Sequence, residues 1–315
     1  MPENILDNNF NKPITEMYGI NKYGYFSQFL AWLGVFSACF LIAQLLSGLF
    51  MVICYGSNIS DLTNIVEGNG NLNGLRFAQM IATVVGFLVP ALIFSKLKEY
   101  PILSYSNANK NFPLIGILLI PLIIYTFYPI INLSFFVNKI SPWNNWMSGS
   151  QEEYKIVVEG LLKDKSVFIF LLNFITIAIL PAICEEWIFR GTLQKFFAEK
   201  INIHLAIFFA AVFFSLIHFE FSGFLPRIIL GMLLGYVFYI SGSLWASIFL
   251  HAVNNGAQVI LMYCNNTGIY KSDMDNPEMP KNWELVVYTF AFYALMSVFY
   301  YFCNKKKRVT LQKNN

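Results

Sequence analysis

The sequence predicts an all-α protein that crosses a membrane several times, and its composition is the first observation behind this. Of the 315 residues, 57% are hydrophobic and only 12% are charged, whereas a soluble domain has about 25% charged and 45–50% apolar residues. The apolar residues are also gathered into stretches near the length of about 20 residues that a membrane-spanning helix needs. We therefore expect a polytopic membrane helix bundle.

Eight apolar stretches define the expected helices in chain order. They cover residues 29–54, 76–95, 113–137, 167–190, 204–219, 226–240, 244–263 and 284–303. An even number of spans puts both termini on the same side of the membrane. The basic run 305–308 follows the last stretch directly, and clusters of this kind favour the cytoplasmic side. We expect an integral membrane protein, in the plasma or inner membrane if the source is bacterial, with both termini cytoplasmic.

The segment between the third and fourth stretches has the pattern of a surface helix. Apolar residues recur at helical spacing at Tyr154, Val157, Val158, Leu161 and Leu162. This spacing predicts a short amphipathic helix on the membrane surface, although an ordinary loop helix packed on the protein fits equally well.

The polar residues divide the chain into three parts. Residues 1–150 form an N-terminal tail and three scaffold helices, which contain almost no polar residues inside the spans. Residues 151–265 hold every promising polar side chain and form the expected catalytic part. Residues 266–315 form an extracytoplasmic loop, the last helix and the basic tail.

Two adjacent carboxylates, Glu185 and Glu186, lie near the end of the fourth stretch, and Arg190 follows. An ionisable side chain at bilayer depth costs on the order of 2.5–3.5 kcal/mol, so such groups are kept where they have partners or line a polar cavity. Neighbouring residues point about 100° apart on a helix, and the i, i+4 spacing favours an ion pair between Glu186 and Arg190. Glu185 then remains the less neutralised carboxylate and suits a general base.

Later spans supply groups that could complete a site. His218 ends the fifth stretch and could orient a water molecule or complete a proton relay. His251 and Asn255 share one helix face in the seventh stretch and could donate to a developing oxyanion or, with Glu185, surround a metal. Each group alone has a structural alternative, because a membrane histidine often packs against a backbone carbonyl and a Glu–Arg pair often locks helices together. Their joint occurrence favours an active site in a wet pocket within the bilayer.

At these residues the sequence resembles the CPBP family of CAAX proteases and bacteriocin-processing enzymes, also called the Abi family. The three family motifs stand here as Glu185-Glu186-Trp-Ile-Phe-Arg190, Phe214-Ser-Leu-Ile-His218 and His251-Ala-Val-Asn-Asn255. They occur in order on successive apolar segments, and the resemblance covers about residues 165–260. It implies an intramembrane endopeptidase similar to the type 2 CAAX prenyl endopeptidases, which trim the last three residues after a lipidated cysteine.

The resemblance also implies roles for the residues. Glu185 would activate water with the help of His218, while His251 and Asn255 would hold the oxyanion. Glu186, Arg190 and Phe214 would support the cavity.

Enzymes of this family are often labelled metalloendopeptidases, so a divalent metal such as zinc remains an open alternative, with Glu185, His218 and His251 as its ligands. No His-Glu-x-x-His motif is present in the sequence, and we expect no tightly bound zinc. The expected partners are the lipid bilayer and a membrane-associated or lipidated peptide or protein, and no nucleic acid.

Two other functions use the same residues. A non-catalytic peptide-binding or immunity-type protein could hold a peptide in the same cavity. A transporter could use the carboxylates as a proton or cation relay, but it should show repeated halves, and the sequence has none.

Overall fold

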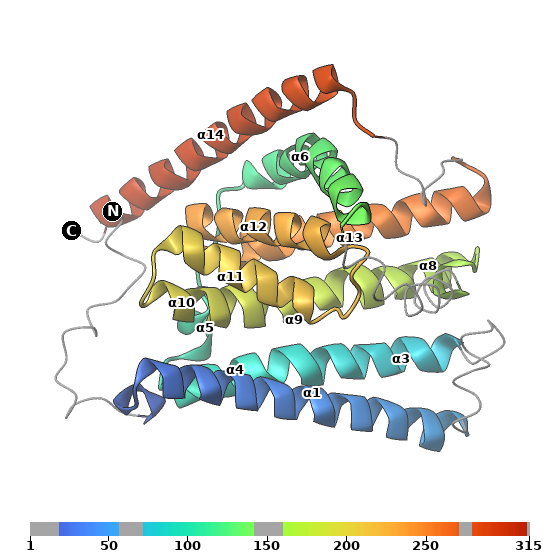
Figure 1. Cartoon of the computed structure of the whole chain (residues 1–315), viewed down its shortest axis with the longest axis horizontal. Coiled ribbons are helices and arrows are strands. Elements are labelled where there is room, and N and C mark those ends of the chain that lie inside the picture. Colours follow the sequence, from blue (N-terminus) through green and yellow to red (C-terminus); the bar gives the residue numbers. More distant parts are fainter. Residues whose placement is uncertain (1–18, 57–71, 142–159, 271–278, 314–315) are drawn as a thin grey trace.

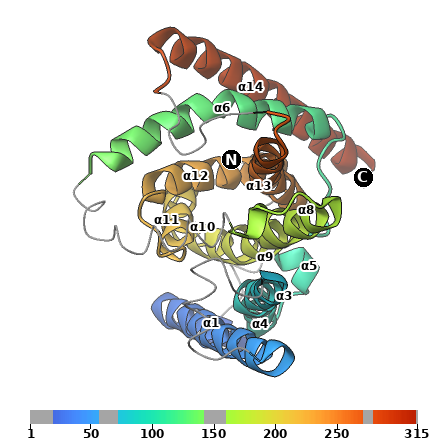
Figure 2. The ribbon, with the colours of Figure 1, turned by 90° about the vertical axis from the view of Figure 1, so that its right-hand side faces the viewer.

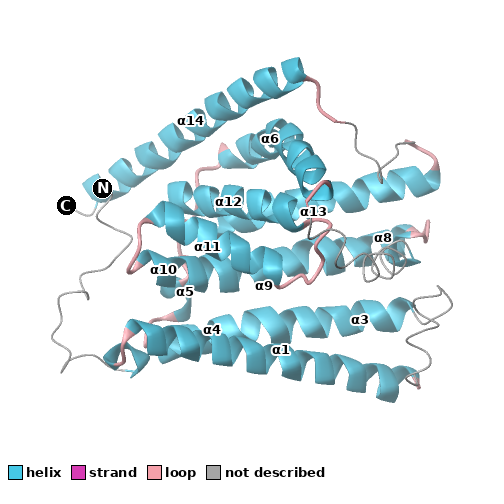
Figure 3. Cartoon of the chain, in the orientation of Figure 1, coloured by secondary structure: helices cyan, strands magenta, loops and turns pink. Residues whose placement is uncertain are grey.

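The computed structural model describes residues 19–56, 72–141, 160–270 and 279–313, and this part of the chain consists of helices and loops without strands (Figure 3). The predicted all-α membrane bundle is therefore confirmed. The predicted surface helix lies mostly outside the described residues, and only its last turn is included.

All eight predicted stretches are helical. They form α1 (Tyr25–Tyr55), α3 (Leu72–Thr83) continued by α4 (Val89–Leu97), α6 (Gly116–Lys139), α8 (Val167–Asn173) continued by α9 (Leu180–Ile188) and α10 (Lys195–Ala198), α11 (Ile203–Leu216), α12 (Phe224–Ser241), α13 (Leu244–Thr267) and α14 (Asn282–Lys313). Two short elements precede them or lie between them, the 3₁₀ turn η3 (Gly19–Lys22) and α5 (Ile102–Tyr105).

The predicted number of about eight spans is larger than the number that length and composition support. Six helices in the described part of the chain are long and apolar enough to cross a membrane. The two exceptions have different reasons: α11 has only 14 residues, and the 24-residue α13 carries histidine, asparagine and glutamine side chains along its length. Both exceptions belong to the part of the chain that holds the site.

Three π-helical turns interrupt the long helices. They are η4 (Val84–Leu88) between α3 and α4, and η6 (Phe174–Ile179) and η7 (Phe189–Gln194) on either side of α9. Both η4 and η6 directly precede a helix with proline in its first two positions, Pro90 and Pro181. Proline has no N–H to donate, and a wider turn beside it accommodates the missing hydrogen bond. Turns of this kind occur frequently at functional sites.

Figures 1 and 2 show how the helices surround α9. The hairpin of α1 with α3 and α4 lies on one side, α6 and α14 lie on the other, and α11, α12 and α13 pack between them. The start of α1 and the end of α14 lie at the same end of the bundle (Figure 1), as an even number of spans requires. Which side of the membrane this end faces stays a prediction.

Close packing of α12 fixes the position of α9 and η7. A Cβ atom on Gly231 would lie 2.9 Å from Cβ of Ala211, and one on Gly235 would lie 2.8 Å from Oε1 of Gln194. The backbone carbonyls of the two glycines are in turn hydrogen-bonded by Arg190 at 3.0 Å and by Gln194 at 3.2 Å. The small-xxx-small pattern therefore brings the backbone of α12 within reach of two polar side chains.

Candidate active site

The two carboxylates lie on the nine-residue helix α9, between the π-helical turns η6 and η7. Both are buried, and Glu186 is completely inaccessible. Their different directions on the helix give them different partners, as the sequence predicted. Glu186 binds within the bundle, whereas Glu185 faces two imidazoles.

Glu186 is held by a cation and a histidine together. Its Oε1 accepts from Nη1 of Arg190 at 2.7 Å and lies 2.9 Å from Nδ1 of His251. The predicted i, i+4 ion pair is therefore confirmed. Its Oε2 is buried and has no hydrogen-bond partner. Because a carboxylate paired with arginine only accepts, the arrangement places the proton of neutral His251 on Nδ1.

Glu185 faces the Nε2 atoms of two histidines. Its Oε2 lies 4.0 Å from Nε2 of His218 and 3.9 Å from Nε2 of His251. The predicted convergence of one carboxylate with imidazoles from two other segments is thus confirmed. His218 sits just after α11, and its Nδ1 is 2.8 Å from the backbone carbonyl of Phe214. A carbonyl can only accept, so neutral His218 also presents an unprotonated Nε2 toward Glu185.

Phe214 fills the space between these groups. Its ring makes edge contacts with the rings of His218 and His251, at centroid distances of 5.0 and 5.8 Å. The guanidinium of Arg190 lies 4.7 Å from the centroid of the same ring, a favourable cation–π geometry. Phe214 therefore separates the Arg190–Glu186 pair from His218 and keeps both imidazoles in place.

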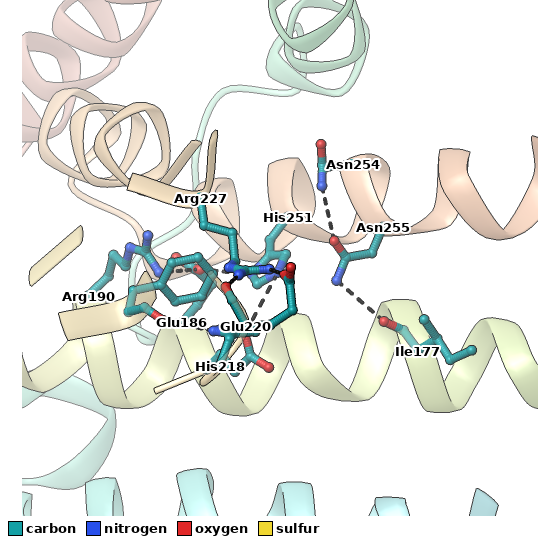
Figure 4. Close-up of polar contacts among 11 residues, drawn as sticks. Ile177, Glu186, Arg190, His218, Glu220, Arg227, His251, Asn254 and Asn255 are labelled. Atoms are coloured by element: carbon teal, nitrogen blue, oxygen red, sulfur yellow. Dashed lines mark hydrogen bonds and ion pairs between the residues drawn. The ribbon is translucent and has the colours of Figure 1, made fainter. Parts of the chain in front are cut away.

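Asn255 does not join this cluster in the structure. Its amide donates to the carbonyl of Ile177 in η6 at 3.3 Å, while its Oδ1 accepts from Asn254 at 3.0 Å. Figure 4 shows both asparagines farther along α13, with Asn255 directed at Ile177 and away from His251. The long hydrogen bond to a π-helical turn is weak, so substrate could replace it.

Two functional candidates were missed by the sequence reasoning, Glu220 and Arg227. Nη1 of Arg227 pairs with the carboxylate of Glu220, and Nη2 donates to its backbone carbonyl. Figure 4 shows the pair directly beside His218. A signal was available, because Glu220 lies two residues after His218 and both charges fall inside an apolar region.

The loop that carries His218 and Glu220 is fixed from outside by α6. The amide of Asn138 donates to the carbonyls of Phe221 and Ser222, both at 2.8 Å, and its Oδ1 accepts from the N–H of Leu225 at 3.1 Å. Phe219, between His218 and Glu220, has a φ angle of 50°. Such a backbone conformation is costly for a bulky residue, and it persists only where the surroundings hold it.

The positions of Glu185 and His251 along their helices explain why the site lies inside the bundle. At 1.5 Å per residue, Glu185 is about 20 Å from the end of α10, and His251 is about 10 Å from the start of α13. Because the two side chains nevertheless meet, the start of α13 must lie farther inside the bundle than the end of α10. At the start of α13, the N–H of Leu244 donates to the carbonyl of Asn107 in the segment after α5.

The sequence left open whether Glu185, His218 and His251 bind a metal ion, and the distances between their side chains bear on this question. Within the described ranges, no group of three or more His, Cys, Asp or Glu side chains is arranged to hold a metal ion. Ligands of a tetrahedral zinc at 2.0–2.1 Å lie about 3.4 Å from one another, closer than the 3.9–4.0 Å between Glu185 and the two imidazoles. The three groups suit zinc by atom type but not by spacing, and we assign no chemical step to a metal.

The comparison with family models agrees with this site. The model described as type II CAAX prenyl endopeptidase Rce1-like matches residues 167–257. This match covers 91 of the 315 residues and supports the resemblance of this segment to the CAAX protease (CPBP) family. The matched segment runs from α8 into α13 and contains both glutamates, Arg190, both histidines and the Glu220–Arg227 pair, whereas Asn138 lies outside it. No curated protein and no solved structure matches the chain.

Proposed function

We propose that the protein is an intramembrane endopeptidase that hydrolyses a peptide bond in a membrane-associated or lipidated peptide, using water activated by Glu185 and His218. The observation that carries this proposal is the convergence of three proton acceptors on one point. Oε2 of Glu185 lies 4.0 Å from Nε2 of His218 and 3.9 Å from Nε2 of His251. Gaps of this size are too long for direct hydrogen bonds and suit a bridging water.

The first step uses the two acceptors at the open side of the site. A water molecule between Glu185 and His218 would donate one hydrogen bond to each, which raises the electron density on its oxygen. The side chain of His218 is 29% exposed and that of Glu185 is 11% exposed, so this is where water and substrate enter. The water oxygen would attack the scissile carbonyl, and its proton would pass to Glu185 and later to the leaving amine.

The developing oxyanion needs donors, and His251 and Asn255 are the proposed ones. His251 donates through Nε2 only as an imidazolium, and Glu186 is placed to stabilise that cation, as the carboxylate of a catalytic triad does. Asn255 would have to release the carbonyl of Ile177 to take part. Arg190 would hold Glu186 in position through the hydrogen bond of 2.7 Å from Nη1 to Oε1.

The test is cleavage of a lipidated or membrane-inserted peptide by the purified protein in detergent. We expect Glu185→Gln and His218→Ala to lower kcat by at least about 100-fold, because general acid–base groups contribute 10²–10⁴. His204→Ala is a matched control. His204 is exposed at the start of α11, away from the site, and its Nδ1 lies 2.8 Å from the hydroxyl of Tyr236. Cleavage that survives both site substitutions would overturn the proposal and leave a peptide-binding protein.

A further inference from the structure

Trp32, in the N-terminal helix α1, forms a hydrogen bond with the helix that carries the two carboxylates. Its Nε1 donates to the hydroxyl of Thr192 in η7 at 3.1 Å, and both side chains are buried. The indole ring is also stacked on Phe36, with 5.4 Å between the ring centroids. A buried indole N–H needs an acceptor, and here the acceptor lies in the turn directly after the carboxylates.

The hydroxyl of Thr192 occupies a backbone acceptor of that turn. It donates to the carbonyl of Ile188, which is the carbonyl that the N–H of Thr192 would use in a regular α-helix. In a π-helical turn each N–H reaches one residue farther back, so the hydroxyl can take the place that this N–H leaves. Threonine hydroxyls bonded in this way bend helices, and this one favours the wider turn.

Trp32 determines the direction of the hydroxyl. A threonine hydroxyl has one hydrogen and two lone pairs, whereas the indole Nε1 only donates. The oxygen of Thr192 therefore accepts from Trp32, and its own hydrogen remains for the carbonyl of Ile188. The two side chains act as one unit, because the loss of either partner removes the bond that directs the hydroxyl.

The width of η7 sets the rotation of α9 relative to α10. The end of α10 is held separately, since the hydroxyl of Tyr25 donates to the carbonyl of Phe196 at 3.2 Å and Lys98 pairs with Glu199 at 3.0 Å. A π-helical turn contains about one residue more than an α-helical turn, and one residue corresponds to about 100° of rotation. With α10 held in place, a narrower η7 would turn α9 and its two carboxylates about the helix axis.

The contacts of Arg190 depend on that rotation, because Arg190 lies inside η7. Its guanidinium donates to Glu186 at 2.7 Å and to the carbonyl of Gly231 at 3.0 Å. The same Oε1 of Glu186 lies 2.9 Å from Nδ1 of His251. A rotation of α9 would therefore separate Glu186 from Arg190 or from His251.

We propose that Trp32 and Thr192 are positioning residues of the active site: their hydrogen bond keeps η7 π-helical and so holds the carboxylates of α9 toward the imidazoles. The inference rests on the proposed endopeptidase function for its effect on the reaction. Both side chains are buried and do not meet substrate. Trp32 lies outside the segment that the family model matches, so the N-terminal helices also contribute to the geometry of the site.

The experiment compares the wild type with four variants in detergent. Thr192→Val removes the hydroxyl with little change in shape, Thr192→Ser keeps it, and Trp32→Phe removes the indole N–H. Thr126→Val is the matched control. The buried hydroxyl of Thr126 also donates to the carbonyl four residues earlier, at 2.9 Å, but it lies in the α-helix α6.

Two properties are measured on each variant. The first is cleavage of a lipidated peptide, separated into kcat and KM. The second is the NMR spectrum of the imidazoles after selective isotope labelling of histidine, which His204→Ala and His218→Ala assign because the sequence has three histidines. The signal of His251 reports its contact with Glu186 and does not depend on turnover.

We expect Thr192→Val and Trp32→Phe each to lower kcat roughly tenfold to hundredfold, because small misplacements of reacting groups have effects of this size. KM should change little, since neither residue contacts substrate. The double variant should lose no more than either single variant, because both act through one hydrogen bond. Both single variants should shift the His251 signal, whereas Thr192→Ser and Thr126→Val should keep the kcat and the signal of the wild type.

A His251 signal that stays unchanged in Thr192→Val and Trp32→Phe would overturn the inference, and so would a Thr192→Ser variant as impaired as Thr192→Val. If Trp32→Phe failed to fold, the comparison of valine with serine at Thr192 would decide. Failure of the proposed function looks different: the His251 signal would shift in the two variants, while the wild type showed no cleavage that depends on Glu185.

Discussion

Replacing Arg190 by methionine tests the central network, because the change keeps side-chain bulk and removes the charge. Arg190 and Glu186 have side chains that are 1% and 0% exposed, with 2.7 Å between Nη1 and Oε1. The substitution leaves Glu186 with only Nδ1 of His251, at 2.9 Å, and its Oε2 is already without a partner. The variant therefore contains a buried carboxylate with one neutral donor.

The expected loss follows from that uncompensated charge. Breaking a buried ion pair by removing one partner costs about 3–5 kcal/mol, whereas replacing both partners by neutral groups costs much less. The cation–π contact with Phe214 adds on the order of 1–2 kcal/mol when it is desolvated. We expect Arg190→Met to lower the free energy of unfolding by at least about 3 kcal/mol, and Glu186→Gln in the same chain to recover about half.

The assay is a double-mutant cycle on unfolding in mixed micelles, with wild type, both single variants and the double variant. Lys98 and Glu199 provide a matched comparison, as a second ion pair at 3.0 Å with exposed fractions of 2% and 16%. If Arg190→Met costs less than about 1 kcal/mol, or the double variant equals the sum of the singles, Glu186 is not a buried carboxylate that depends on Arg190. The proposed stabilisation of a His251 imidazolium would then fail as well.

Three further predictions concern packing, the loop and metals. Gly235→Ala should lower the free energy of unfolding by about 1–3 kcal/mol through overpacking against Gln194, measured as a fall in Tm; Gly48→Ala, whose Cβ meets nothing within 4 Å, should not. Asn138→Ala removes two hydrogen bonds to the His218 loop and one to the first turn of α12, each contributing about 0.5–1.5 kcal/mol, and should lower kcat at least tenfold. The exposed Asn109→Ala is the control, and an unchanged kcat would show that the loop keeps its conformation without Asn138. Dialysis against a zinc chelator should leave activity intact, and activity lost on dialysis and restored by zinc alone would contradict the metal-free mechanism.

Composition and periodicity were enough to predict the fold, because a bilayer leaves few alternatives. Long apolar stretches without water must satisfy their backbone groups internally, and helices do so. The number of membrane-spanning helices was harder to predict from the sequence. Hydropathy alone does not distinguish α11, which is too short, from a full span. It also does not show that α13 buries His251 and Asn254 inside the protein.

The site was predictable where it depends on helix geometry and unpredictable where it depends on tertiary contacts. The i, i+4 spacing predicted the pair of Glu186 with Arg190, and that pair is present. The direction of Asn255 was not available from spacing, because it depends on the carbonyl that η6 exposes at Ile177. Arg227 was missed because its importance comes from a loop that returns it beside His218.

The tautomers of His218 and His251 explain why the cluster needs a proton donor between its three acceptor atoms. Phe214 and Glu186 each accept from an Nδ1–H, so both neutral imidazoles turn an unprotonated nitrogen toward Glu185. Three acceptors facing one point do not stabilise each other, and they are satisfied when a water donates its protons to them or when one imidazole is protonated. In the proposed mechanism, the first state precedes attack on the peptide bond. The second state, in which Glu186 balances the charge on His251, needs a proton from solvent on His251, because the proton of the attacking water passes to Glu185. The contacts that fix each Nδ1 therefore direct both Nε2 atoms toward Glu185.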